Sequence, residues 1–199
     1  MARRSEHSLE EIKELILAAT EEIVEEEGFE ALKVRKIAMN IGYTVGSIYM
    51  VFDNMEDLIL HVKARTLDAL NEYLDEVIKI NPDPEASIFA LCKGYAKFAD
   101  EHFNFWIMLF SYQSAKPEPL PDWYQEKVNQ PFIKFEIFFQ KIAPQKNQVE
   151  IKNASRTVWA GVHGVCLLAL AKKLELVGLE GVEDSIDMLV GNFLAGWKA

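Results

Sequence analysis

The chain has 199 residues, 50% of them hydrophobic, and a formal net charge of −10. Its 10 Gly and 7 Pro are too few for a disordered chain, and its acidity excludes a protein that coats nucleic acid non-specifically. We therefore expect a full core with room for two subdomains, and any contact with a polyanion confined to a small surface.

The first predicted helix ends at Gly28-Phe29. Its apolar residues recur every three or four positions, as on a helix that buries one face; they are Ile12, Leu15, Ile16, Ala19 and Ile23. A run of glutamates forms the solvated face of the same helix, and we assign this run no other role; it comprises Glu21, Glu22, Glu25, Glu26 and Glu27.

Residues 33–52 predict a helix-turn-helix. The first short helix buries apolar residues at helical spacing, namely Val34, Ile37, Ala38 and Ile41. Gly42 ends this helix, because glycine takes the left-handed conformation at little cost. Thr44 is the expected N-cap of the next helix, which turns Ile48 and Phe52 inward. Its outward positions reach base edges and phosphates when such a helix enters the major groove.

Further along the chain, every segment with a clear pattern is helical. Asn54 and Asp57 form a capping signal for a long helix, and prolines or glycines separate the helices that follow it. The predicted ranges are Met55–Ile80, Pro84–Glu101, Asn104–Tyr112, Asp122–Ile142, Gln148–Val177 and Val182–Lys198. The fold class is therefore all-α, with about nine helices in total. The long helix from Met55 joins the two parts of the chain without a flexible linker.

From about Leu9 to Leu67 the sequence resembles the N-terminal domain of TetR-type transcriptional regulators. The segments ILAATEEIVEEEGFEALKVRKIA, GSIYMVF and EDLIL carry the resemblance. It implies that the segment Thr44–Phe52 is the recognition helix and that Lys33 and Arg35 lie near the phosphate backbone. The predicted domains are residues 1–54, which bind DNA, and residues 55–199, which bind an effector and dimerise. The predicted DNA-binding residues are Arg3, Arg4, Lys33, Arg35, Thr44, Val45, Gly46, Ser47, Tyr49, Met50 and Met55.

Three positions depart from the family pattern. Where the family commonly carries basic residues or a His, this chain has Val45, Met50-Val51 and Met55. Residues 1–66 hold 8 Lys and Arg against 13 Asp and Glu, a net charge of −5. A separate hypothesis is that Val45, Met50 and Met55 contact thymine methyl groups. Such contacts would favour A·T-containing sites. Arg3 and Arg4 form either an arm that enters the minor groove or a solvated tail.

Aromatic residues concentrate in the second part of the chain. The segment Tyr95–Phe139 holds 13 of the chain's 22 aromatics, and composition alone does not distinguish a bulky core from a cavity wall. The family resemblance implies a small effector here, apolar or aromatic. The candidate ligand-binding residues are Phe98, His102, Trp106, Phe110, Trp123, Phe135, Phe139, Trp159 and His163.

Trp159 and His163 lie four residues apart, and with Gly164 they resemble a Trp-His-Gly signature of one TetR subgroup. His163 has two open interpretations. It is either a satisfied core histidine or a group that bonds the effector and senses pH near neutrality.

The last two helices predict a homodimer. Val158–Ala171 is apolar on every face apart from His163, so a partner must help to cover it. The predicted interface residues are Val162, Val165, Leu170, Ile186, Leu189, Val190, Phe193, Leu194 and Trp197. The resemblance implies a repressor that holds a palindromic operator with half-sites ~34–36 Å apart and is released by its effector.

Other functions find less support. Cys92 and Cys166 are predicted to be buried thiols, and we expect no catalytic residues, no cofactor and no metal site. Because no apolar segment precedes the first helix, we predict no signal peptide. The longest uncharged stretch, near Val158–Ala171, is too short to span a bilayer, so we also predict no membrane span and a cytoplasmic protein. An enzyme using Cys166 or His163 is disfavoured, since no nucleophile–base pattern accompanies either residue. A helical small-molecule-binding dimer with degenerate DNA binding stays open, because of the missing cations.

Overall fold

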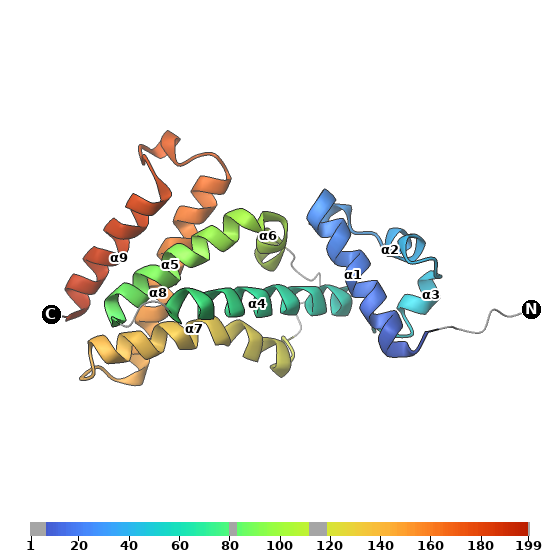
Figure 1. Ribbon diagram of the computed structural model, residues 1–199, viewed down its shortest axis with the longest axis horizontal. Coiled ribbons are helices and arrows are strands. Elements are labelled where there is room, and N and C mark those ends of the chain that lie inside the picture. The colour runs from blue at the N-terminus through green and yellow to red at the C-terminus, as the bar shows by residue number, and fades with distance from the viewer. Residues whose placement is uncertain (1–6, 80–82, 112–118, 199) are drawn as a thin grey trace, which may run out of the picture. The chain divides into compact units, whose positions relative to one another are not determined.

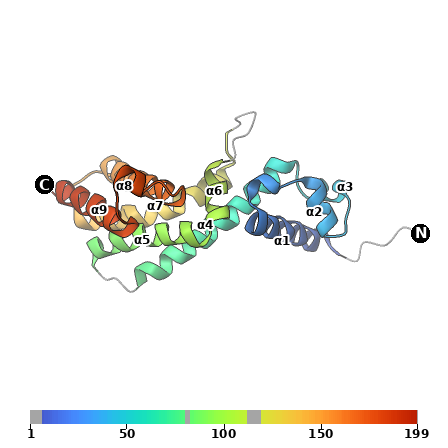
Figure 2. The ribbon, with the colours of Figure 1, turned by 90° about the horizontal axis from the view of Figure 1, so that it is seen from above.

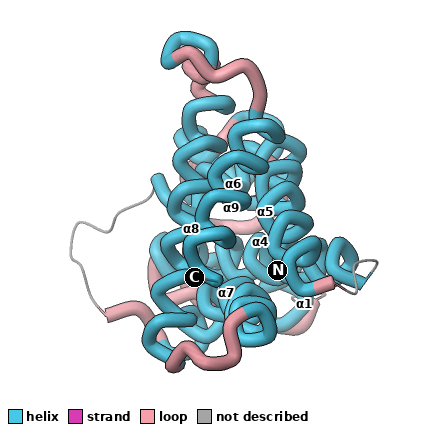
Figure 3. The backbone as a smooth tube through the Cα atoms, turned by 90° about the vertical axis from the view of Figure 1, so that its left-hand side faces the viewer, coloured by secondary structure: helices cyan, strands magenta, loops and turns pink. Residues whose placement is uncertain are grey.

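The computed structural model describes residues 7–79, 83–111 and 119–198, and the regular structure in these ranges is helical throughout (Figures 1 and 3). The all-α prediction is confirmed. The α-helices are α1 (Leu9–Glu27), α2 (Val34–Asn40), α3 (Val45–Ile48), α4 (Met55–Lys79), α5 (Pro84–Glu101), α6 (Phe103–Ser111), α7 (Asp122–Ile142), α8 (Gln148–Leu170) and α9 (Val182–Lys198). Two 3₁₀ turns, η1 (Phe29–Ala31) and η2 (Glu175–Val177), complete the set for these ranges.

The chain divides into two compact units. Unit 1 comprises Met1–Thr66 and Asn104–Leu120, and unit 2 comprises Leu67–Phe103 and Pro121–Ala199. This division differs from the expected boundary at residues 54 and 55. The first turns of α4 belong to unit 1, because Leu58 and Val62 are buried in its core.

Helix α1 buries a wider face than its sequence pattern predicts. Ser8 and Glu11 form a capping box at its start, with Ser8 Oγ accepting from the Glu11 N–H at 3.2 Å. Leu17 and Val24 are buried in the core of unit 1, whereas Leu15, expected inside, is exposed. The buried stripe is centred on residues 16, 20 and 23, which leaves position 15 at its edge.

The turn between α2 and α3 forms as the sequence predicts. Gly42 has φ +71°, and Thr44 Oγ1 accepts from the Ser47 N–H at 3.2 Å to cap α3. Helix α3 is shorter than the recognition helix predicted over Thr44–Phe52, since it ends at Ile48 and turns follow. Asn54 Oδ1 already caps the Asp57 N–H of α4 at 2.9 Å. The chain must therefore leave the α3 axis within a few residues.

Replacing Gly42 by alanine is expected to lower the free energy of unfolding by about 1–2 kcal/mol, because a Cβ at positive φ is strained. The space around Gly42 is open, so this cost is one of backbone conformation alone. Urea unfolding measures it. Gly46→Ala is the matched control, since that glycine lies inside α3 at ordinary φ, and equal losses in both variants would contradict the assignment.

Helix α6 packs into unit 1 although about 40 residues separate it from the rest of that unit in sequence. Met108 is fully buried in the core that α1, α2 and α3 build. Asn104 Nδ2 donates to the Glu25 carbonyl at the end of α1 at 2.9 Å. Lys63 Nζ of α4 donates to the Leu109 carbonyl at 3.2 Å. The ends of α6 are therefore bonded to α1 and α4.

Burial lowers the pKa of Lys63 to about 8. The unfolded chain holds this proton up to the ordinary pKa, so the folded state binds fewer protons between the two values. The free energy of unfolding is therefore expected to rise between about pH 8 and pH 10 relative to a Lys63→Met variant. Urea unfolding of both proteins across that range measures the difference. A difference that stays constant with pH would contradict the shift.

Unit 2 packs the later turns of α4 with α5, α7, α8 and α9. Helices α4 and α7 run in the same direction (Figures 1 and 2). Two ion pairs two turns apart join them: Lys127–Asp68 at 2.6 Å and Lys134–Asp75. Helices α8 and α9 lie side by side and approach closely at Gly161, where an added Cβ would lie 2.7 Å from Leu189 Cδ2. Helix α8 ends at Leu170 and not at the predicted Val177. The chain reverses there, with Lys172 at φ +54°.

Candidate nucleic-acid interface

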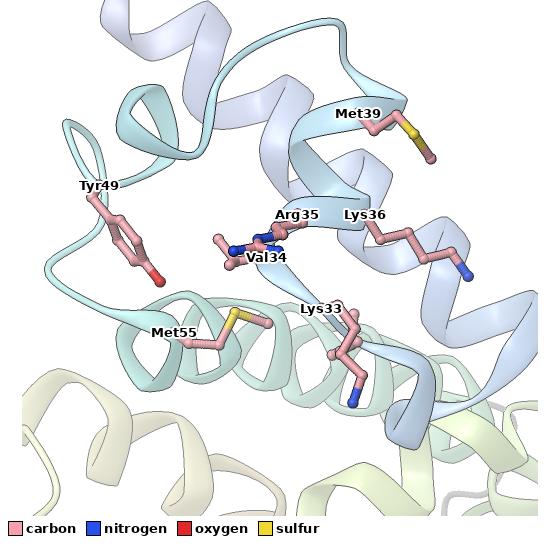
Figure 4. Close-up of a pocket in the computed structure, with 8 residues that line it drawn as sticks. Lys33, Val34, Arg35, Lys36, Met39, Tyr49 and Met55 are labelled. Atoms are coloured by element: carbon pink, nitrogen blue, oxygen red, sulfur yellow. The ribbon is translucent and has the colours of Figure 1, made fainter.

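A hollow of about 630 Å³ lies on the surface of unit 1, between the start of α2, the turn after α3 and the start of α4. Figure 4 shows Arg35, Tyr49 and Met55 directed into it from these three segments. The lining residues are Leu32, Lys33, Val34, Arg35, Lys36, Met39, Tyr49 and Met55.

The positive charge of this hollow comes from Lys33, Arg35 and Lys36, which lie at the N-cap and in the first turn of α2. Lys36 forms an ion pair with Glu27 of α1. Lys33 and Arg35 are exposed, and in the ranges that the structure describes neither meets a carboxylate within ion-pair distance. Both cations are therefore accessible to an external anion, and their contact with the phosphate backbone stays a prediction.

The exposed surface of α3 and of the turn that follows it is partly apolar. Ile48 and Phe52 are buried and anchor α3 to the core of unit 1, while Tyr49 and Met50 remain exposed. Gly46 is exposed as well, and an added Cβ there would meet only Thr44 Oγ1, at 3.6 Å. The backbone of α3 can thus approach another surface closely.

The remaining predicted DNA contacts differ in accessibility. Thr44 is exposed and Ser47 half-buried, and their hydroxyl oxygens lie 3.0 Å apart. Val45 and Met55 are half-buried and pack against the core of unit 1. Arg3 and Arg4 lie outside the described residues. The hollow also contains Met39 and Lys36, which the sequence reasoning missed. Met39 occupies an outward position of α2, and an apolar residue at such a position is itself a sign of an interaction surface.

The predicted ligand-binding residues are divided between the two units. Trp106 and Phe110 belong to unit 1, and the other seven belong to unit 2. Phe98, Trp106, Phe135 and Phe139 are buried, whereas His102, Phe110 and Trp123 are exposed. Phe139 of α7 packs edge-on against Phe193 and Trp197 of α9, and so contributes to the core between α7 and α9.

Trp159 and His163 join a polar and aromatic cluster in unit 2. The hydroxyl of buried Tyr95 lies 2.8 Å from His163 Nδ1, and the His163 ring stacks on Trp159 with centroids 5.1 Å apart. Phe132 of α7 meets Trp159 edge-on at 5.2 Å. Burial lowers the pKa of His163, so the imidazole is neutral near pH 7. Tyr95 was absent from the predicted set.

Four predicted dimer residues are buried within the single chain, namely Val162, Ile186, Val190 and Leu194. They face the chain's own core, and their placement on a partner surface was wrong. The other five, Val165, Leu170, Leu189, Phe193 and Trp197, are half-buried. The exposed side of α8 and α9 instead carries Leu167 and Met188, which are 41% and 68% exposed.

Two further expectations concern the thiols and the membrane. Cys92 and Cys166 are buried and free, and burial raises the pKa of the Cys166 thiol to about 12. Among the described helices, none combines the length and the apolar character that crossing a bilayer requires.

Two short helices joined by a glycine turn, the second of them capped by Thr44, are the architecture of a helix-turn-helix. Two family descriptions match the sequence itself: "Bacterial regulatory proteins, tetR family" over residues 16–62 and "Tetracyclin repressor-like, C-terminal domain" over residues 88–193. The chain belongs to the TetR family of transcriptional regulators.

Individual relatives agree with this assignment. The "Fatty acid metabolism regulator protein" of Bacillus subtilis (strain 168) is 27% identical over 88 residues, which are 44% of this chain and 45% of that protein. A protein of unknown function from Rhodococcus sp. RHA1 has the same fold, with a TM-score of 0.77, 17% identity and 98% of each chain covered. The regulator FadR from Bacillus subtilis, in complex with stearoyl-CoA, aligns with a TM-score of 0.67 and 14% identity over 92% of this chain and 98% of that chain. The Trp-His-Gly subgroup stays a prediction.

Proposed function

We propose that this TetR-family regulator is a homodimeric repressor that binds a palindromic operator and releases it when an effector binds. The observation that carries the proposal is the exposed surface of unit 1. There Lys33 and Arg35 adjoin the accessible side of α3, without carboxylate partners in the ranges that the structure describes. Cations beside a helix-turn-helix bind phosphates, while the second helix of the motif contacts bases.

Selection of bound sequences from a random DNA pool tests the proposal directly. The expected product is an inverted repeat whose half-site centres lie ~34–36 Å apart. Failure of the full-length protein to enrich any sequence, at low salt as well as high salt, would overturn the repressor function. It would favour the second candidate, a small-molecule-binding dimer, for which the net charge of −5 over residues 1–66 is the specific observation.

The proposed dimer surface is the outer side of α8 and α9. Positions 153, 157, 160, 164 and 167 alternate in steps of four and three residues along α8, and all are exposed or half-exposed. Small residues such as Gly164 and Ala195 allow two helix pairs to approach closely, and Leu167 and Met188 supply the apolar area. Four helices related by a two-fold axis would cover this stripe.

The proposed effector is a molecule with a long apolar chain. Two observations support this class: the apolar and aromatic interior of unit 2, and the fatty-acid regulators among the relatives. The cluster of Tyr95, Trp159 and His163 offers polar atoms beside aromatic rings, a combination that orients a ligand in an apolar site.

Acyl-CoA compounds of graded chain length, added to the protein–operator complex, test the effector class. Long chains are expected to release the DNA, while free CoA, which lacks the chain, leaves the complex intact. The effector must bind the released state more tightly, typically by ~5–150-fold. Equal release by CoA and by the longest acyl-CoA would contradict a chain-binding site without affecting the DNA-binding proposal.

A further inference from the structure

Two methionines of unit 1 are largely exposed. Met39 on α2 is 74% exposed, and Met50, in the turn that extends α3, is 72% exposed. Exposed methionine is an adaptable apolar contact, because its unbranched thioether fits irregular surfaces. If α3 and the turn after it contact DNA, an exposed apolar side chain there is best matched by an apolar group on the DNA.

The chemistry around Met50 narrows that target. From Thr44 to Phe52 the sequence contains no Arg, Lys, Asn, Gln, Asp or Glu, the residue types that form paired hydrogen bonds with guanine or adenine or accept from cytosine. The hydroxyls of Thr44 and Ser47 lie 3.0 Å apart, and Thr44 Oγ1 also caps the helix. Few polar groups on α3 are left for base edges.

We propose that Met50 reads thymine, by contact of its side chain with the C5-methyl group in the major groove. The thymine methyl is the apolar feature that the major-groove edge of a base pair displays. This inference rests on the proposed function, since it presupposes that α3 enters the major groove. It also assigns to Met50 alone a role that sequence reasoning had divided among three residues. Val45 and Met55 pack against the core of unit 1 and have less free surface.

Met39 provides a matched control within the same unit. It is the same residue type with nearly the same exposure, but it lies on α2 and lines the cationic hollow. Its surroundings include Lys33 and Arg35, which are the proposed phosphate contacts and not proposed base contacts. Substitution of Met39 therefore controls for a general loss of apolar surface.

The test uses the full-length protein and the operator obtained by selection. Each thymine of the half-site is replaced in turn by deoxyuridine, which removes the C5-methyl group alone, and affinities are measured by fluorescence anisotropy. At one thymine per half-site the wild-type protein is expected to lose about fourfold in affinity, the effect of one buried methyl-sized group, and about fifteenfold when both half-sites are changed.

The variants connect that loss to Met50. Met50→Ala is expected to bind the thymine and deoxyuridine operators equally at the sensitive position, whereas Met39→Ala and the conservative Met50→Leu keep the discrimination. Because Met50 is largely exposed, thermal unfolding of Met50→Ala is expected to match that of the wild type.

If every thymine of the selected site tolerated deoxyuridine, the proposed contact between Met50 and a thymine methyl would be wrong, and the repressor function would be unaffected. The same conclusion would follow if Met50→Ala still distinguished thymine from deoxyuridine. Failure to select any DNA sequence would overturn both proposals.

Discussion

Replacing Lys33 and Arg35 by glutamine is expected to lower operator affinity several hundredfold at ~0.15 M salt. Each cation that neutralises a phosphate releases counterions, which contributes about fivefold at this salt concentration. A dimer presents both residues twice, so the two substitutions remove four contacts. The slope of log K against log salt is expected to become shallower by roughly 3–4 for the same reason. Affinity measured over a range of salt concentrations gives both quantities.

Lys172→Gln with Lys173→Gln is the matched control for this variant. Both lysines are exposed, lie in unit 2 and carry the same total charge as Lys33 and Arg35. The control changes the net charge of the protein equally but removes no proposed phosphate contact. Equal losses of affinity in the two double variants would show that only the overall charge matters, and the proposed interface would then be wrong.

A double variant with Leu167→Glu and Met188→Glu is expected to be monomeric, since it places four like charges in an apolar two-fold interface. Operator affinity is then expected to fall by roughly 10²–10⁴, because the second half-site is no longer bound intramolecularly. Sedimentation equilibrium measures the oligomeric state, and fluorescence anisotropy measures the binding.

Ile133→Glu controls for the introduction of a charge on an exposed aliphatic position. Ile133 is 51% exposed on α7, outside the proposed dimer surface. This control is expected to keep both the dimer and the affinity. If the double variant remained dimeric, the surface of α8 and α9 around Leu167 and Met188 would not be the interface.

Local patterns predicted the helix-turn-helix well, because its features are set within a few residues. Gly42, the Thr44 cap and the Asn54 cap all occupy their predicted positions, since each satisfies backbone groups nearby in sequence. The length of α3 was overestimated for the same reason. Periodicity continues to Phe52, but the cap of the next helix requires the chain to turn earlier.

Tertiary placement was less predictable. An apolar stripe shows that a face is buried without showing which neighbour buries it, so Ile186 and Val190 were assigned to a partner although α9 packs them into its own unit. The nine candidate ligand residues were grouped by composition and not by contact. Sequence gave no sign that Trp106 and Phe110 belong to unit 1, because that depends on where α6 packs.

The packing of α6 affects how the protein is made. Translation delivers α1 to α3 well before Met108, the residue that completes their core. A nascent chain that ends near Thr66 therefore lacks one of the apolar side chains that fill this core. Unit 1 reaches its final stability only when α6 has emerged from the ribosome. The core of unit 1 is therefore complete only after more than half of the polypeptide has been synthesised.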